Sequence, residues 1–158
     1  MAETVYQYNG PGFSPMGDKS RFVLPSKIRK TLKDSNGGEK TLYVDRHPVF
    51  PCLIGFGEPY KRLLMEDLAT VSPQSAERHA LNFQLNSFID LPFDESGRII
   101  FPKPILEMGG INDEISFHGA GPYFTMWDPD QLLAMEGPTF MAAQIHCRAH
   151  RAAAKGRK

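Results

Sequence analysis

A short segment of this 158-residue chain occurs twice, 77 residues apart. Arg21 to Ile28 reads RFVLPSKI and Arg98 to Ile105 reads RIIFPKPI, so an arginine, three apolar residues, a proline and an isoleucine recur at the same positions. The apolar residues predict a buried strand, and the proline predicts a helix that begins directly after it. Two copies are too few for a solenoid. The repeat therefore predicts a pseudo-symmetric pair of halves that share one core.

The surroundings of the two copies predict the same order of elements in both halves. A polar turn precedes each copy, and a helical stretch and then a strand follow it. These elements are expected at residues 17–20, 26–33 and 41–44 in the first half, and at residues 94–97, 104–108 and 114–118 in the second.

A helical connector is expected between the repeats. Residues 58–68 predict one helix, and Ser72-Pro73 predicts the start of another, with Ser72 as N-cap and Pro73 in the first turn. Five residues at helical spacing in the second helix should face the core: Ala76, Ala80, Leu81, Leu85 and Phe88.

After the second repeat, residues 123–127 predict a strand, and Asp128 predicts the N-cap of a helix that runs to about Glu136. The last dozen residues are rich in alanine, arginine and lysine and predict a frayed or disordered tail.

The 14 glycines and 13 prolines favour many short strands joined by turns over a helix bundle. The expected fold is therefore mainly β with short helices, of the α+β class. Its expected divisions are repeat 1 at residues 8–57, the helical connector at 58–87, repeat 2 with its following helix at 88–136 and a basic tail at 137–158.

The sequence predicts a soluble, cytoplasmic protein without a membrane partner. No apolar run approaches the roughly 18 residues of a membrane span, and the first residues, MAETVYQYNG, lack the basic and apolar regions of a signal peptide. Cys52 and Cys147 lie far apart in the sequence, so they define neither a disulfide framework nor a zinc site.

The formal net charge is zero, but the positive charge is concentrated in two segments. Residues 19–33 hold six basic side chains and residues 146–158 hold five, and neither segment contains an acid. The other 130 residues carry 7 basic and 18 acidic groups. A cationic patch on an anionic body is expected of a nucleic-acid binder. The alternative is that residues 27–33 form only the solvated face of a short helix.

Arg21 and Arg98 each mark the first residue of a predicted strand, directly after a turn. At that position both side chains could stand on one surface. Each arginine could instead pair with an acid of its turn, Asp18 or Asp94. The two interpretations are compatible, because an acid can orient a guanidinium that still reaches a ligand.

The second copy reads Asp94-Glu-Ser-Gly97-Arg98, then three apolar residues and Pro102, and in this D-x-x-G-R pattern the chain resembles the MraZ family. Members of that family regulate the bacterial division and cell-wall gene cluster. In the first copy Arg21, Pro25 and Arg29 fit the family pattern, and GPYFTMWDP at residues 121–129 is also similar. The resemblance covers roughly residues 8–136.

The resemblance implies two tandem SpoVT/AbrB swapped-hairpin repeats that form one barrel-like unit, with a helical connector and a C-terminal helix. It implies a transcriptional repressor, not an enzyme, that binds tandem short G-rich promoter repeats in double-stranded DNA as a ring-like homo-oligomer on the nucleoid. No cofactor, metal or small-molecule substrate is expected.

Arginine is the usual bidentate donor to guanine O6 and N7, so Arg21 and, second to it, Arg98 are the candidates for base contact. Phosphate contacts suit Lys19, Lys27, Arg29 and Lys30. The first copy is favoured because residues 94–114 hold five acids, which weaken contact with phosphate.

Two residues depart from the family pattern in the first turn. Gly17 stands where Asp is usual and Ser20 where Gly is usual. The missing acid and the disfavoured positive φ at a serine predict an altered loop. They also motivate the alternative of an oligomeric scaffold or adaptor that no longer reads DNA.

The sequence offers little for an enzyme. Gly55-x-Gly57 and Gly119-x-Gly121 do not complete G-x-G-x-x-G, and there is no Walker loop or G-x-S-x-G. His146-Cys147-x-x-His150 could hold a metal, but the sequence shows no further ligands beside it. His47, His79 and His118 are scattered, and Trp127 is expected in the core and not as a platform for bases.

Overall fold

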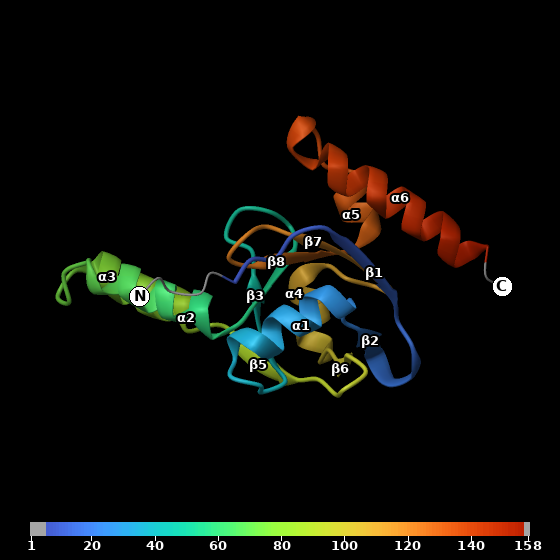
Figure 1. The fold of residues 1–158 in the computed structure, drawn as a ribbon. Coiled ribbons are helices and arrows are strands. Elements are labelled where there is room, and N and C mark those ends of the chain that lie inside the picture. Colours follow the sequence, from blue (N-terminus) through green and yellow to red (C-terminus); the bar gives the residue numbers. More distant parts are fainter. Residues whose placement is uncertain (1–5, 157–158) are drawn as a thin grey trace.

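The computed structural model describes residues 6–156. In this part of the chain, six α-helices accompany eight strands, so the fold is a mixed α+β fold (Figure 1). The helices are α1 (Ser26–Ser35), α2 (Glu58–Ala69), α3 (Ala76–Leu85), α4 (Lys103–Gly109), α5 (Pro129–Leu133) and α6 (Met141–Lys155). The strands are β1 (Pro11–Pro15), β2 (Arg21–Val23), β3 (Thr41–Arg46), β4 (Leu53–Phe56), β5 (Ile89–Pro92), β6 (Arg98–Ile100), β7 (Glu114–Gly119) and β8 (Phe124–Trp127).

Six strands form one antiparallel sheet in the order β1-β7-β8-β4-β3-β5. Strand β1 of the first half pairs with β7 of the second, whereas β5 of the second half pairs with β3 of the first. Strands β4 and β8 meet at the centre of the sheet. Each half therefore contributes its first strand to the other. The corresponding strands of the two halves are β1 and β5, β3 and β7, and β4 and β8. When each is replaced by its counterpart, the strand order reads the same from either edge of the sheet.

The two copies of the repeated segment pair with each other. Strands β2 and β6 form a separate antiparallel two-stranded ribbon, hereafter the β2–β6 ribbon, in which Phe22 lies opposite Ile99. Both of these side chains are buried, and the rings of Phe22 and Phe101 meet edge to face at 5.5 Å. Burial of these side chains attaches the ribbon to the main core.

The prediction of a wholly buried strand in each copy is wrong. Because side chains alternate along a strand, the first and third apolar residues of each copy are buried and the middle one faces outward. Val23 and Ile100, on the other face, are 46% and 49% exposed.

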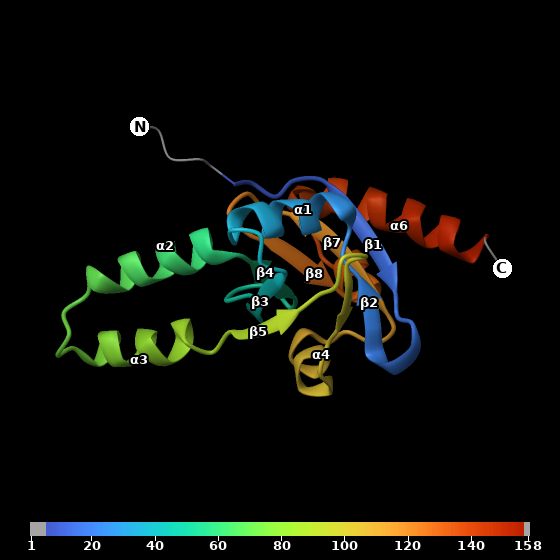
Figure 2. The same cartoon turned by 60° about the horizontal axis from the view of Figure 1, so that its bottom comes forward.

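Helices α2 and α3 form an antiparallel hairpin that projects from the body (Figure 2). The predicted core-facing positions in α3 are therefore wrong: Ala76 and Ala80 are exposed, and Leu81, Leu85 and Phe88 are only partly buried. The predicted N-cap is also wrong, since Ser75, not Ser72, accepts the Arg78 backbone N–H at 3.0 Å. Helix α3 packs against α2, and Phe88, after the end of α3, packs against Tyr43 and Phe56 of the sheet.

The prediction of a disordered tail is wrong for residues 141–155, which form α6, whereas residues 157–158 of the predicted tail lie outside the described residues. Its buried residues Ala143 and Cys147 pack with Trp127, Leu132 and Cys52 in a second hydrophobic cluster. Arg151 then joins α6 to the body through ion pairs to Glu114 and Asp130. A polar sequence can form a stable helix when one narrow face is buried in this way. No helix in residues 6–156 is long and apolar enough to cross a membrane.

Candidate nucleic-acid interface

Arg21 and Arg98 lie on the outward face of the β2–β6 ribbon. The register places Arg21 opposite Ile100 and Val23 opposite Arg98. The two arginines are therefore diagonal neighbours, with backbones about 7–8 Å apart, and both line the same shallow hollow. The outward face consists of two guanidinium groups that alternate with two aliphatic side chains.

The turn before Arg98 holds this arginine in place. The Asp94 carboxylate accepts the backbone N–H groups of Ser96 and Arg98, each at 2.9 Å, and the Arg98 Nε–H at 2.7 Å. These hydrogen bonds, led by that from the Arg98 backbone, hold the pKa of Asp94 below its usual range. The side chain of Arg98 remains 54% exposed, so its remaining N–H groups can reach a ligand.

The turn before Arg21 is built differently. Gly17 offers no carboxylate, and the described structure contains no ion pair between Arg21 and Asp18. Lys19 and Ser20 adopt positive φ values of 61° and 58°, so Ser20 takes the left-handed conformation in spite of its side chain. In the second turn that conformation is adopted by Gly97, with φ 83°. Lys19 is exposed at the tip of the first turn.

Some basic residues of α1 hydrogen-bond to other parts of the chain, whereas others are exposed to solvent. Lys27 donates to the Asn9 side chain, and Arg29 donates to the Ser96 carbonyl, so Arg29 of the first half supports the turn of the second. Lys30 is exposed and lines a hollow beside Asp94 and Glu95. Glu95 pairs with Lys33 at 3.7 Å and with Lys40 at 2.8 Å, and these lysines hold its pKa below its usual range.

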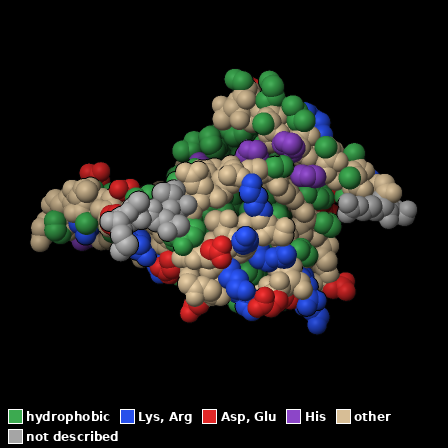
Figure 3. Space-filling model, in the orientation of Figure 1, with side chains coloured by type: hydrophobic (Ala, Val, Ile, Leu, Met, Phe, Trp, Pro, Cys, Tyr) green, Lys and Arg blue, Asp and Glu red, His purple; other side chains and the backbone are tan. Residues whose placement is uncertain are grey.

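Figure 3 shows that Lys and Arg side chains gather at the end of the molecule formed by α1 and the β2–β6 ribbon, with acidic side chains between them. The candidate residues Lys19, Arg21, Lys27, Arg29, Lys30 and Arg98 all lie on or beside this end. Val23 and Ile100 were not predicted as part of it from the sequence. The period of two along each strand was the signal that could have identified them.

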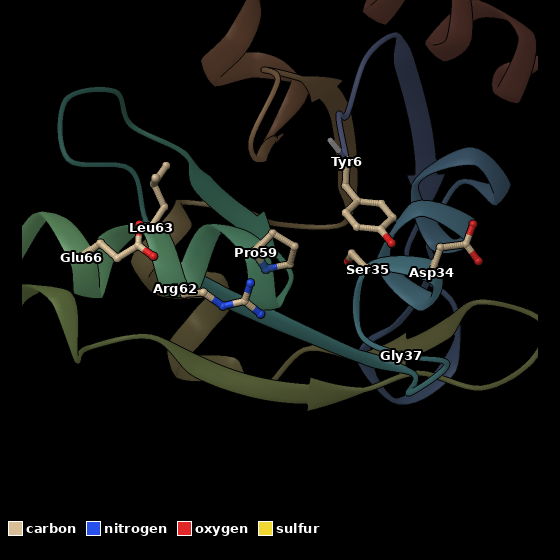
Figure 4. A pocket seen from close by; sticks show the side chains of 8 residues that line it. All are labelled: Tyr6, Asp34, Ser35, Gly37, Pro59, Arg62, Leu63 and Glu66. Carbon is tan, nitrogen blue, oxygen red and sulfur yellow. The ribbon is translucent and has the colours of Figure 1, made fainter. Parts of the chain in front are cut away.

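A hollow of about 520 Å³ lies at the base of α2, away from this end (Figure 4). Arg62 lies on one side of Tyr6 and Asp34 on the other, and Leu63 and Glu66 belong to α2. Asp34 and Ser35, which also line it, belong to the end of α1.

The histidine motif of α6 does not form a metal site in the described structure. No group of three His, Cys, Asp or Glu side chains in residues 6–156 could hold a metal ion. Cys147 is buried, and burial raises the pKa of its thiol. Trp127 is only 2% exposed, which confirms its predicted place in the core.

Comparisons with known proteins agree with the sequence motifs. The chain is 30% identical over 122 residues to a protein of Rhodospirillum rubrum named "Transcriptional regulator MraZ", with 75% of this chain and 77% of the relative covered. Proteins of the same name from Yersinia pestis and Yersinia pseudotuberculosis are 24% identical over 122 residues, covering 77% of this chain and 79% of each relative. No family model matches the chain.

Proposed function

The chain belongs to the MraZ family of transcriptional regulators, and on this premise we propose that it binds double-stranded DNA sequence-specifically through the outward face of the β2–β6 ribbon. The observation that carries the proposal is that Arg21 and Arg98 share this outward face, on which Arg98 is exposed and Arg21 is partly buried. The regulatory role is the one that the names of its relatives indicate.

A two-stranded antiparallel ribbon fits the major groove of B-DNA. Two arginines on its groove-facing side could each donate two hydrogen bonds to the O6 and N7 atoms of a guanine. Each good bidentate pair contributes about 1–3 kcal/mol of discrimination. This chemistry supports guanine-rich sites, and we propose that these sites lie in the gene's own promoter.

Phosphate contacts would fix the register of the ribbon in the groove. Lys19 and Lys30 are exposed beside the ribbon and suit this role, and Lys27 could reach a phosphate if it released Asn9. Arg29 holds the second turn through the Ser96 carbonyl, so we assign it to positioning.

One ribbon offers only two base-reading groups, so a single chain should bind weakly. We propose that the two halves are tandem AbrB-like repeats, as the exchange of β1 and β5 between them supports. We further propose that copies of the chain form a ring that binds evenly spaced promoter repeats and represses the division and cell-wall gene cluster from the nucleoid. Linked sites gain affinity through effective concentration.

The direct test is a titration of labelled DNA from the gene's upstream region, followed by a footprint. At about 100 mM salt we expect protection of G-rich repeats. Arg21→Ala should abolish the preference for these repeats and leave assembly intact. Lys30→Ala should weaken binding to all duplexes about equally and reduce the salt slope by about one.

Arg62→Ala is the matched control, since Arg62 is an exposed arginine of α2 outside this end of the molecule. If the wild-type protein assembles but shows no preference for its upstream region, the chain is an oligomeric scaffold. If Arg21→Ala and Arg98→Ala both keep the wild-type preference, DNA is read by another surface.

A further inference from the structure

We propose that Val23 and Ile100 read DNA as well, by contacting the C5-methyl groups of thymines on base pairs next to those that the arginines contact. This inference rests on the proposed function, which supplies the major groove as the surface that the ribbon faces. It adds a second specificity element of different chemistry, apolar contact, to hydrogen bonding by arginine.

The geometry of the ribbon places aliphatic and guanidinium groups in alternation. Val23 lies directly opposite Arg98, and Ile100 lies directly opposite Arg21. Directly opposed side chains are about 5 Å apart at Cβ, which lies between one and two base-pair rises of about 3.4 Å. When an arginine contacts one base pair, its aliphatic neighbour can therefore reach a base pair close beside it.

The exposure of these two residues is unexplained by the fold. About half of each side chain is exposed, although Phe22 and Ile99 in the same strands are buried. Met16, 39% exposed, lines a second hollow together with Val23, and this hollow shares Arg21 and Arg98 with the first. In the major groove the thymine methyl is the one apolar group that a base pair presents, and aliphatic side chains are its usual contacts.

Charge identifies DNA as the occupant in preference to a second copy of the chain. The two aliphatic residues are flanked on the ribbon by Arg21 and Arg98, with Lys19 at the adjoining turn and Lys30 on the helix that follows β2. Asp94 compensates Arg98 within each copy, but no ion pair among the described residues compensates Arg21, Lys19 or Lys30. Two copies packed face to face would bring these three cations together, which is unfavourable without a counter-charge. A duplex supplies that counter-charge through its phosphates.

The experiment compares two versions of the footprinted duplex, one with thymine and one with deoxyuridine at every thymine position. Deoxyuridine keeps the base-pairing groups and removes only the methyl. For each methyl group that the protein contacts, the wild type should bind the deoxyuridine duplex about fourfold more weakly, because burial of one such group corresponds to about 0.8 kcal/mol. Val23→Ser should weaken binding to the thymine duplex and bind both duplexes more nearly alike. Ile100→Ser should behave in the same way.

Val49→Ser is the matched control, since Val49 is 74% exposed in the loop between β3 and β4. This variant should lose as much affinity as the wild type when thymine is replaced by deoxyuridine. The substitution in the protein and the change in the DNA do not interact, so their effects on the binding free energy should add. Equal binding of both duplexes by the wild-type protein overturns the inference and leaves the proposed function standing.

The inference is also overturned if both serine variants lose as much affinity as the wild type when thymine is replaced by deoxyuridine. In that case a shift in their assembly state, seen by sedimentation, would assign the face to contacts between copies. Absence of preferred binding to any duplex would instead overturn the proposed function itself.

Discussion

At the scale of single residues, the turns before Arg21 and Arg98 both lead into a strand of the β2–β6 ribbon, but different residues stabilise them. In the second turn, Asp94 accepts two backbone N–H groups and Gly97 takes the positive φ. The first turn has neither residue, yet Ser20 adopts φ 58°. The sequence predicted the departure at Gly17 and Ser20, but not that this serine would adopt the left-handed conformation.

Ser20→Gly should stabilise the chain by about 1 kcal/mol, because a left-handed conformation costs a non-glycine residue about 1–2 kcal/mol and glycine loses part of this gain to chain entropy. Urea unfolding followed by circular dichroism measures the change. Ser72→Gly, in the exposed loop between α2 and α3 and without a positive φ, is the control and should be neutral or slightly destabilising. A destabilised Ser20→Gly variant would show that the serine side chain holds the turn.

His47 gives a pH dependence with a defined sign. It is buried, and its Nδ1 accepts the backbone N–H groups of Val49 and Phe50, each at 3.0 Å. Burial and, after it, the charge of Arg46 lower its pKa from 6.5. The unfolded chain therefore binds the proton more readily, so the stabilisation is complete above about pH 6.5 and is lost as the pH falls below it.

His47→Asn should reduce this loss of stability between pH 7 and pH 5, because the amide oxygen of asparagine can accept the same bonds without titrating. Thermal unfolding at a series of pH values tests it. His79→Asn, at an exposed position of α3, should leave the profile unchanged. Identical profiles for His47→Asn and the wild type would exclude His47 as the source.

At the scale of elements, the repeat predicted the turn, strand and helix of each half close to their observed positions. The structure places β2 at Arg21–Val23 and β6 at Arg98–Ile100. Inside the repeat, the error concerns the burial of Val23 and Ile100, and the other errors concern the helices outside the repeat. Apolar spacing shows that a helix has an apolar face, but not whether this face meets the core or another helix, as in the α2–α3 hairpin. For α6, the prediction of disorder relied on the overall composition and missed the two residues that are buried, Ala143 and Cys147.

Arg151 shows why the basic tail is part of the fold. Its guanidinium donates to Glu114 at 3.1 Å and to Asp130 at 2.8 Å, and this bonding lowers the pKa of Asp130. Arg151→Ala should lower the midpoint of thermal unfolding by about 2–4 °C. Arg148→Ala, an exposed neighbour on α6, should leave it unchanged.

The pH dependence of this difference is a second readout. The lowered pKa of Asp130 means that its stabilisation is present above the ordinary pKa of 3.8 and is lost as the pH falls through its value in the folded chain. The difference in the midpoint of thermal unfolding between Arg151→Ala and the wild type should therefore become smaller in acid. Equal midpoints at pH 7 would show that the ion pairs of Arg151 do not stabilise the attachment of α6.

At the scale of the whole molecule, the topology explains how a neutral chain can present a cationic end. The pairing of β2 with β6 brings Arg98 of the more acidic second half beside the basic first half. The sequence predicted which residues carry the charge and the symmetry of the halves. It could not predict that Glu95, from the second turn, would lie between Lys33 and Lys40. Such a contact depends on how the halves dock.

Substitution of Glu95 therefore tests whether the cationic end binds DNA through its charge. Glu95 competes with phosphate for two lysines, so Glu95→Gln should raise the affinity for any duplex severalfold and steepen the dependence on salt by about one. The preference for G-rich repeats should stay constant, because no base contact changes. Glu66→Gln, in α2, removes the same net charge elsewhere and should have a much smaller effect. If both variants raise affinity equally, net charge alone attracts DNA. If Glu95→Gln weakens binding, Glu95 orients the lysines and does not mask them.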